Sequence, residues 1–244
     1  MEIITLGSSS KGNGYVIDRT LVIEAGVPIK ELKKTLNFNL SGIQAVLISH
    51  SHGDHSKYAS EYLKAGIDCY MSKHTKSELN LQNFTNRIKI IEHQKVFIIG
   101  DYTILPFELS HDVMNFGYLI YNRKTKEKLL FATDTYSINY NFKDVNYYMI
   151  EANYSEKIIR ENIKKGLLAE SLAKRLYHSH FSLENCIDFL RCQDLSKCMK
   201  IILIHLSDGN SNEKMFVQEI KKEFMIDTEA ADKYKGFKLS IEPF

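Results

Sequence analysis

His50-Ser51-His52-Gly53-Asp54-His55 places three imidazoles and one carboxylate within six residues. The apolar run 45–49 that precedes it has the length and composition of a buried strand. The apolar spacing of residues 57–64, which follow it, is typical of a helix. We therefore expect residues 50–55 to form a loop at the carboxyl end of a strand, where open α/β sheets build their sites.

This stretch, which we call the metal loop (residues 50–55), has the side chains of a metal site. Neutral imidazole nitrogens and carboxylate oxygens are suitable ligands for zinc, manganese or iron. Several such groups in one short loop crowd and desolvate each other, which is costly unless an ion binds them. The alternative is a histidine-rich surface loop without a ligand, since any short motif can occur by chance.

The length and composition of the chain predict a globular protein. Its 244 residues fit one large domain or two small ones, and no segment has the composition of a linker. A hydrophobic fraction of 44% is ordinary for a protein with a real core. The net charge of +2 is close to neutral, so composition alone does not indicate a nucleic-acid binder.

The sequence also bears on the cellular compartment. No apolar run approaches the ~20 residues that a membrane span needs, and residues 1–6 lack the basic start and apolar core of a signal peptide. The four cysteines form no C-x-x-C pair, which favours reduced thiols. We expect a cytoplasmic protein with no membrane partner, and the sequence does not indicate its oligomeric state.

Periodicity and turn residues predict alternating strands and helices. Strands are predicted over 3–6, 15–18, 21–24, 45–49, 67–71, 88–91, 96–99, 102–107, 116–121, 128–132, 147–151 and 200–204, with shorter pieces at 226–230 and 237–241. Helices are predicted over 28–36, 57–64, 75–81, 155–190 with breaks and an interruption at 178–182, and 211–224.

Ligand-type side chains recur at or just beyond the ends of predicted strands. They are His50, His111, Asp134, Glu151 and His205. Polar residues that recur at these positions among apolar strands indicate convergence on one rim of a sheet. The glycine- and serine-rich turn 7–14 could present N–H groups and hydroxyls to a phosphate. A plain loop between two strands explains that turn equally simply, and the turn lacks the G-K-[ST] ending of a P-loop.

The metal loop, a lone histidine, a strand-terminal aspartate and a later strand-terminal histidine together resemble the metallo-β-lactamase superfamily over essentially the whole chain. Shorter segments are similar to landmarks of its YycJ-like (WalJ-type) branch, a bacterial group described as exonucleases. These segments are Leu6-Gly7-Ser8-Ser9-Ser10-Lys11-Gly12-Asn13, Glu151-Ala152-Asn153-Tyr154, Ser179-His180-Phe181-Ser182 and His205-Leu206-Ser207.

The resemblance implies an α/β protein, a four-layer αββα sandwich, as a single metallo-β-lactamase-fold domain over residues 1–244. It implies two divalent ions, Zn²⁺ or Mn²⁺. The first ion would be held by His50, His52 and His111, the second by Asp54, His55 and His205, and Asp134 would bridge both. Glu24 stands where the family usually has Asp before Ala-Gly, so its support of the metal loop is in question.

Two divalent ions side by side can bring the pKa of a shared water near neutrality and stabilise the negative charge of a substrate. Asp54 is expected to orient the attacking hydroxide. His180 resembles the histidine that meets the phosphate or the leaving oxygen in phosphodiesterase branches. The alternative for His180, and more so for His178, is a polar residue at a helix end. The residues expected to bind substrate are Ser9, Asn13, His180 and Ser207.

Three functions fit these features. The first is a phosphodiesterase or nuclease that acts on DNA, 5′-3′ exonuclease-like by resemblance. The second is a hydrolase of a small cyclic phosphodiester. The third is a non-catalytic member that binds metal or a partner, which is disfavoured because every metal-ligand position is filled. A long basic channel would favour DNA, and a closed pocket would favour the small ester.

Overall fold

The computed structural model describes residues 1–239, which divide between two compact units. Unit 1 comprises residues 1–107, 120–127 and the described residues from 231 onward, and unit 2 comprises 108–119 and 128–230. The prediction of a single domain over 1–244 stays a prediction. Within residues 1–239, no helix is long and apolar enough to cross a membrane.

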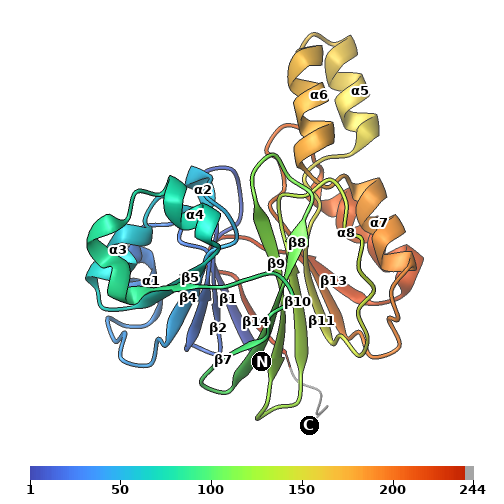
Figure 1. Ribbon diagram of the computed structural model, residues 1–244. Helices are drawn as coiled ribbons and strands as arrows, with labels where there is room; N and C mark the ends of the chain where they lie inside the picture. Colours follow the sequence, from blue (N-terminus) through green and yellow to red (C-terminus); the bar gives the residue numbers. More distant parts are fainter. Residues whose placement is uncertain (240–244) are drawn as a thin grey trace. The chain divides into compact units, whose positions relative to one another are not determined.

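The strands form two mixed sheets of seven strands each (Figure 1). The first has the order β14-β1-β2-β3-β4-β5-β6 and the second β13-β12-β11-β10-β9-β8-β7. The strands are β1 (Glu2–Gly7), β2 (Gly14–Ile17), β3 (Leu21–Ile23), β4 (Ala45–Leu47), β5 (Asp68–Met71), β6 (Ile88–Ile90), β7 (Phe97–Ile99), β8 (Tyr102–Leu109), β9 (Asn115–Asn122), β10 (Lys128–Ala132), β11 (Tyr147–Glu151), β12 (Lys200–Ile204), β13 (Asp227–Ala230) and β14 (Gly236–Lys238).

Helices follow or connect these strands and flank the sheets, as the predicted αββα class requires. They are α1 (Ile29–Thr35), α2 (Gly53–Ser56), α3 (Ala59–Lys64), α4 (Lys73–Glu78), the 3₁₀ helix η1 (Gln82–Arg87), α5 (Glu156–Lys164), α6 (Glu170–Ser179), α7 (Leu183–Arg191) and α8 (Glu213–Phe224). The predicted strands all occur. The residues 240–241 of the last predicted strand lie outside the described residues.

The core of unit 1 explains where the metal loop is placed. Apolar side chains of β1–β5 pack against Leu32 of α1 and against Tyr62 and Leu63 of α3. From β3 to β6 neighbouring strands are parallel, so their carboxyl ends share one edge of the sheet. The loop that follows β4 therefore starts at that edge, as expected from the sequence.

Unit 2 also has parallel strands whose carboxyl ends lie at one edge of its sheet. The strands β10, β11, β12 and β13 are parallel, and every residue of β11 is buried. Phe189 of α7 packs against Tyr148 of β11 with ring centroids 6.5 Å apart. Because parallel strands with covered faces end at a common edge, the loops after β10, β11 and β12 start beside one another.

Two elements differ from the sequence-based expectation. The metal loop is not a loop throughout, because α2 begins at Gly53 and carries Asp54 and His55. The backbone N–H groups of His55 and Ser56 both donate to His52 O at 3.0 Å, which closes this single turn. The 3₁₀ helix η1 was not predicted, since residues 82–87 show no apolar period and none of them is buried.

Candidate metal centre

The three histidines of the metal loop lie close together in unit 1. The ring of His50 is 4.3 Å from that of His55 and 4.8 Å from that of His52, measured between centroids. His50 and His55 are fully buried. Ser56 fixes the intervening turn, because its Oγ donates to Ser51 O at 2.7 Å and to His52 O at 2.9 Å. The rings of His50, His52 and His55 are thus brought close together by one short segment of the chain.

The glycine- and serine-rich turn 7–14 packs against the metal loop through main-chain contacts. Asn13 N donates to Asp54 O at 2.7 Å, and Gly26 N donates to Asn13 O at 3.0 Å. A Cβ on Gly26 would lie 1.7 Å from Asp54 O and 2.8 Å from Asn13 N. Only glycine fits this close approach of three backbone segments. The turn therefore supports the ligands of the metal loop.

Asn13 is fully buried, and its side chain contacts the metal loop. Its Nδ2 lies 3.1 Å from His55 Nε2 and 3.4 Å from Asp54 Oδ2, and it donates to Ser9 O at 3.1 Å. Ser9 is half-buried. These contacts position His55 and Asp54. The substrate-binding roles expected for Ser9 and Asn13 stay predictions.

Glu24 reaches the metal loop despite its longer side chain. Its carboxylate is fully buried, with Oε1 3.5 Å from His55 Nδ1, and Oε2 accepts a hydrogen bond from Ser49 N at 3.3 Å. Its backbone is left-handed, with φ of 68°. A glutamate at this position therefore still contacts a candidate ligand.

Unit 2 contributes a second cluster, at the ends of its parallel strands. The ligand atoms of Asp134, Glu151, His180 and His205 all lie within 4.8 Å of one another. His205 Nδ1 is 3.2 Å from Asp134 Oδ1 and 2.9 Å from Glu151 Oε1. Asp134, Glu151 and His205 are buried, and the side chain of His180 is 19% exposed. His180 is therefore the member of this cluster with the most access to solvent.

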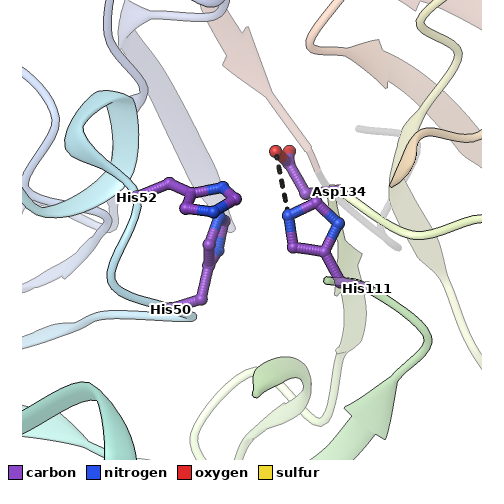
Figure 2. A group of neighbouring side chains, drawn as sticks. All are labelled: His50, His52, His111 and Asp134. Carbon is purple, nitrogen blue, oxygen red and sulfur yellow. Dashed lines mark ion pairs between the residues drawn. The ribbon is translucent and has the colours of Figure 1, made fainter. Parts of the chain in front are cut away.

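Hydrogen bonds hold both the side chain and the main-chain carbonyl of Asp134. Thr133 Oγ1 donates to Asp134 Oδ1 at 2.8 Å, and Asn115 Nδ2 donates to Asp134 O at 2.7 Å. His111, in the segment between β8 and β9, has its Nε2 4.0 Å from Asp134 Oδ2 and 3.1 Å from Asp112 Oδ1. Figure 2 shows this ion pair of unit 2, together with the rings of His50 and His52 from unit 1.

The backbone at two candidate ligands is left-handed. Asp134 has φ of 52° and His205 has φ of 55°. Residues with a Cβ adopt this region at a cost, and such residues cluster at functional sites. Asn153 Nδ2 donates to His205 O at 2.8 Å, and Ser207 N donates to Asn153 O at 2.9 Å, which holds the turn after β12. The observed role of Ser207 is in this turn, and its predicted contact with substrate stays a prediction.

Glu151 organises the second cluster. Its Oε1 is 2.8 Å from His180 Nδ1, and its Oε2 accepts from Thr135 N and Phe181 N, both at 3.1 Å. Burial opposes the charged form, but His180 and the hydrogen bonds from both histidines outweigh it and lower the pKa of Glu151. Burial likewise opposes the charge on His180, and the Glu151 carboxylate outweighs it and raises the pKa of His180.

Sequence reasoning noticed Glu151 as a strand-terminal ligand type but gave it no role, and it gave none to Asn153. Their position at the end of a buried strand and the resemblance of residues 151–154 to a family landmark were the signals that could have indicated these roles. The buried His and Asp clusters are consistent with a dinuclear metal site. Buried carboxylates behind histidines are the usual support of such ligands.

Comparisons with known proteins agree with this chemistry. The family model described as a beta-lactamase superfamily domain matches residues 19–205. An exodeoxyribonuclease WalJ of Streptococcus pneumoniae is 25% identical over 226 residues, covering 86% of this chain and 83% of that protein. An exodeoxyribonuclease YycJ of Bacillus anthracis is 24% identical over 232 residues, covering 80% and 88%.

Solved structures show the same fold. Zn²⁺-bound PqqB from Methylobacterium extorquens aligns with a TM-score of 0.73 at 12% identity, over 98% of this chain and 100% of that one. The metallo-beta-lactamase fold protein YhfI from Bacillus subtilis aligns with a TM-score of 0.69 at 14% identity, over 97% and 99%. The predicted fold class is confirmed by these matches together with the two mixed sheets and their flanking helices.

Proposed function

The chain belongs to the metallo-β-lactamase superfamily, and from that membership we propose that it is a metal-dependent phosphodiesterase that cuts DNA as a 5′-3′ exonuclease. The reaction class is supported by the buried histidine and aspartate clusters. The choice of DNA is supported by the relatives named exodeoxyribonuclease, which align over most of the chain. A cytoplasmic location fits this substrate and the four cysteines, which are all free thiols.

We propose that two divalent ions, Zn²⁺ or Mn²⁺, are held as the family resemblance implies. His50, His52 and His111 would hold one, Asp54, His55 and His205 the other, and Asp134 both. When bound, such a pair supplies Lewis-acid polarisation and a water-derived nucleophile at neutral pH. The protein supplies orientation: Glu24 faces His55 Nδ1, which leaves Nε2 as the ligand atom, and Asn13 N donates to Asp54 O beside it. Glu151 and Asn153 hold His205.

The observation that carries the phosphodiester assignment is the contact between His180 and Glu151. The 2.8 Å contact turns His180 Nδ1 towards the carboxylate, which fixes the ring and makes Nε2 the nitrogen available to a substrate. In the proposed reaction, Nε2 donates a proton or a hydrogen bond to the leaving oxygen as it departs. Asp54, on α2 beside His55, would orient the nucleophile.

The test is a hydrolysis panel with the stripped protein and with Zn²⁺ or Mn²⁺ added back. Its substrates are labelled single-stranded DNA, the same RNA sequence, a cyclic nucleotide and bis-(p-nitrophenyl) phosphate. We expect metal-dependent shortening of DNA from its 5′ end. The variant Asp134→Ala, which lacks the proposed bridging carboxylate, serves as the inactive control. Faster hydrolysis of the cyclic nucleotide or of RNA would contradict the DNA assignment, and hydrolysis of none would contradict the enzyme.

A further inference from the structure

The helices α5 and α6 form a hairpin that interrupts unit 2 between Glu151 and His180. Figure 1 shows the two helices side by side, extending beyond the carboxyl end of β11 and away from the strands of unit 2. Ile159 and Ala173 are buried and pack with Tyr154 into a small core of their own. The apolar side chains of the two helices therefore pack against each other, and the remaining faces of the hairpin are exposed to solvent.

This hairpin is the basic part of a nearly neutral chain. Residues 155–179 contain six lysines and arginines against three glutamates. Because the whole chain has 32 Lys and Arg and 30 Asp and Glu, the remaining residues have 26 basic and 27 acidic side chains. The excess positive charge of the protein thus resides in this hairpin. The six basic side chains are Lys157, Arg160, Lys164, Lys165, Lys174 and Arg175, and all are exposed.

Most of this charge is not neutralised locally. Arg160 pairs with Glu156 and Lys165 with Glu161. The other four basic side chains form no ion pair within residues 1–239. They are Lys157, Lys164, Lys174 and Arg175. Lys157, Arg160 and Lys164 share one face of α5 because they are three and four residues apart. This spacing makes a row of cations along a helix.

We propose that the α5–α6 hairpin binds the phosphate backbone of the nucleic-acid substrate. The inference rests on the proposed function and adds a binding surface to it. Exposed cations, four of the six without a carboxylate partner, are the feature that attracts a polyanion, since each phosphate contact releases counterions. The last residue of α6 is followed directly by His180, so a strand held along the hairpin is led to the proposed proton donor.

A membrane surface fits the hairpin less well than DNA. Leu167 and Leu172, near the connection between the helices, are 74% and 48% exposed. An interfacial helix needs a continuous free apolar face. Here that face is taken up by Ile159, Ala173 and their neighbours in the small core.

The experiment replaces the four cations without ion pairs, Lys157, Lys164, Lys174 and Arg175, by serine. The matched control replaces four other exposed lysines, also without ion pairs within the described chain, by serine: Lys124, Lys126, Lys214 and Lys222. Binding of a phosphorothioate-linked single-stranded oligonucleotide, which resists cleavage, is followed by fluorescence anisotropy. The salt concentration runs from about 50 to 200 mM. Circular dichroism and metal content verify that both variants fold.

We expect the hairpin variant to bind roughly tenfold or more weakly, and its logarithmic salt slope to become shallower by about 3, or about 0.7 for each lost phosphate contact. The control variant should keep the wild-type slope. Equal affinity and equal slope in the two variants would overturn the inference, whether or not the chain cuts DNA. So would binding of the wild type to phosphatidylserine vesicles but not to DNA. A failed hydrolysis panel, with hairpin-dependent DNA binding intact, would instead overturn the proposed enzyme.

Discussion

Glu24 and Glu151 are fully buried carboxylates, and each contacts a histidine proposed to bind metal, one in each unit. Neither stands in the metal loop. A carboxylate behind an imidazole fixes its tautomer and makes it a better ligand. At the scale of single residues, the proposed metal centre is thus supported by acidic side chains that lie outside its histidine-rich motif.

The first prediction concerns Glu24. Replacement by Gln keeps the size of the side chain but removes the negative charge near His55 Nδ1. We expect Glu24→Gln to lower zinc affinity roughly 10–100-fold, which a titration against a competing chelator would measure. Glu31→Gln is the control, because Glu31 is also buried but contacts Lys233 and Tyr234 instead. An equal loss in both variants would contradict a specific role for Glu24.

The second prediction separates reaction classes through His180. We expect His180→Ala to lower turnover of DNA by about 10²–10⁴-fold, because the leaving oxygen loses its proton donor. Metal content should be unchanged, since His180 is not a proposed ligand. The loss should shrink for bis-(p-nitrophenyl) phosphate, whose leaving group departs without a proton.

His178→Ala is the matched control for His180, because His178 is exposed on the last turn of α6, the helix that ends directly before His180. It should retain turnover. Loss of metal in His180→Ala would make His180 a ligand, and unchanged turnover would remove the local support for a phosphodiesterase.

At the scale of elements, apolar runs predicted the strands well because these strands are buried on both faces and read as continuous hydrophobic segments. The positions of the candidate ligands after β4, β10 and β12 follow from the same runs. Pattern alone did not reveal α2, because a single turn is too short to show a helical period. It also did not reveal the left-handed turns at Asp134 and His205, which depend on tertiary hydrogen bonds from Asn115 and Asn153.

The third prediction concerns the junction of the turn 7–14 with the metal loop. We expect Gly26→Ala to lower both the melting temperature and the zinc content, since its Cβ would overlap Asp54 O and Asn13 N. Gly53→Ala is the control. Gly53 lies inside the metal loop itself, yet a Cβ there meets nothing within 4 Å. If Gly53→Ala were the more damaging of the two to folding, the argument from backbone approach would be wrong.

At the scale of the whole molecule, the proposed ligand set draws four residues from unit 1 and three from unit 2. These are His50, His52, Asp54 and His55 of the first, and His111, Asp134 and His205 of the second. Ligands so far apart in the sequence come together only in the folded protein. Metal binding is therefore expected to stabilise the native chain by mass action.

The fourth prediction follows from this linkage. Zinc at about 100 times its dissociation constant should stabilise the fold by roughly 2.7 kcal/mol. For a chain of this size that is a rise of about 5–10 °C in melting temperature, which differential scanning calorimetry would measure. EDTA should reverse the rise, and Asp134→Ala should largely abolish it. A rise of the same size in Asp134→Ala would show that zinc binds elsewhere.

At Asp134 and His205 the proposed ligand side chain requires a left-handed backbone that costs stability, so these two positions cannot be optimal for both stability and activity. Glycine would adopt these angles without the cost of order 1–3 kcal/mol that a Cβ incurs. A laboratory selection for heat resistance alone, carried out without metal and with no demand for hydrolysis, is therefore expected to replace these residues early. A selection that also demands turnover would have to gain its stability elsewhere in the chain.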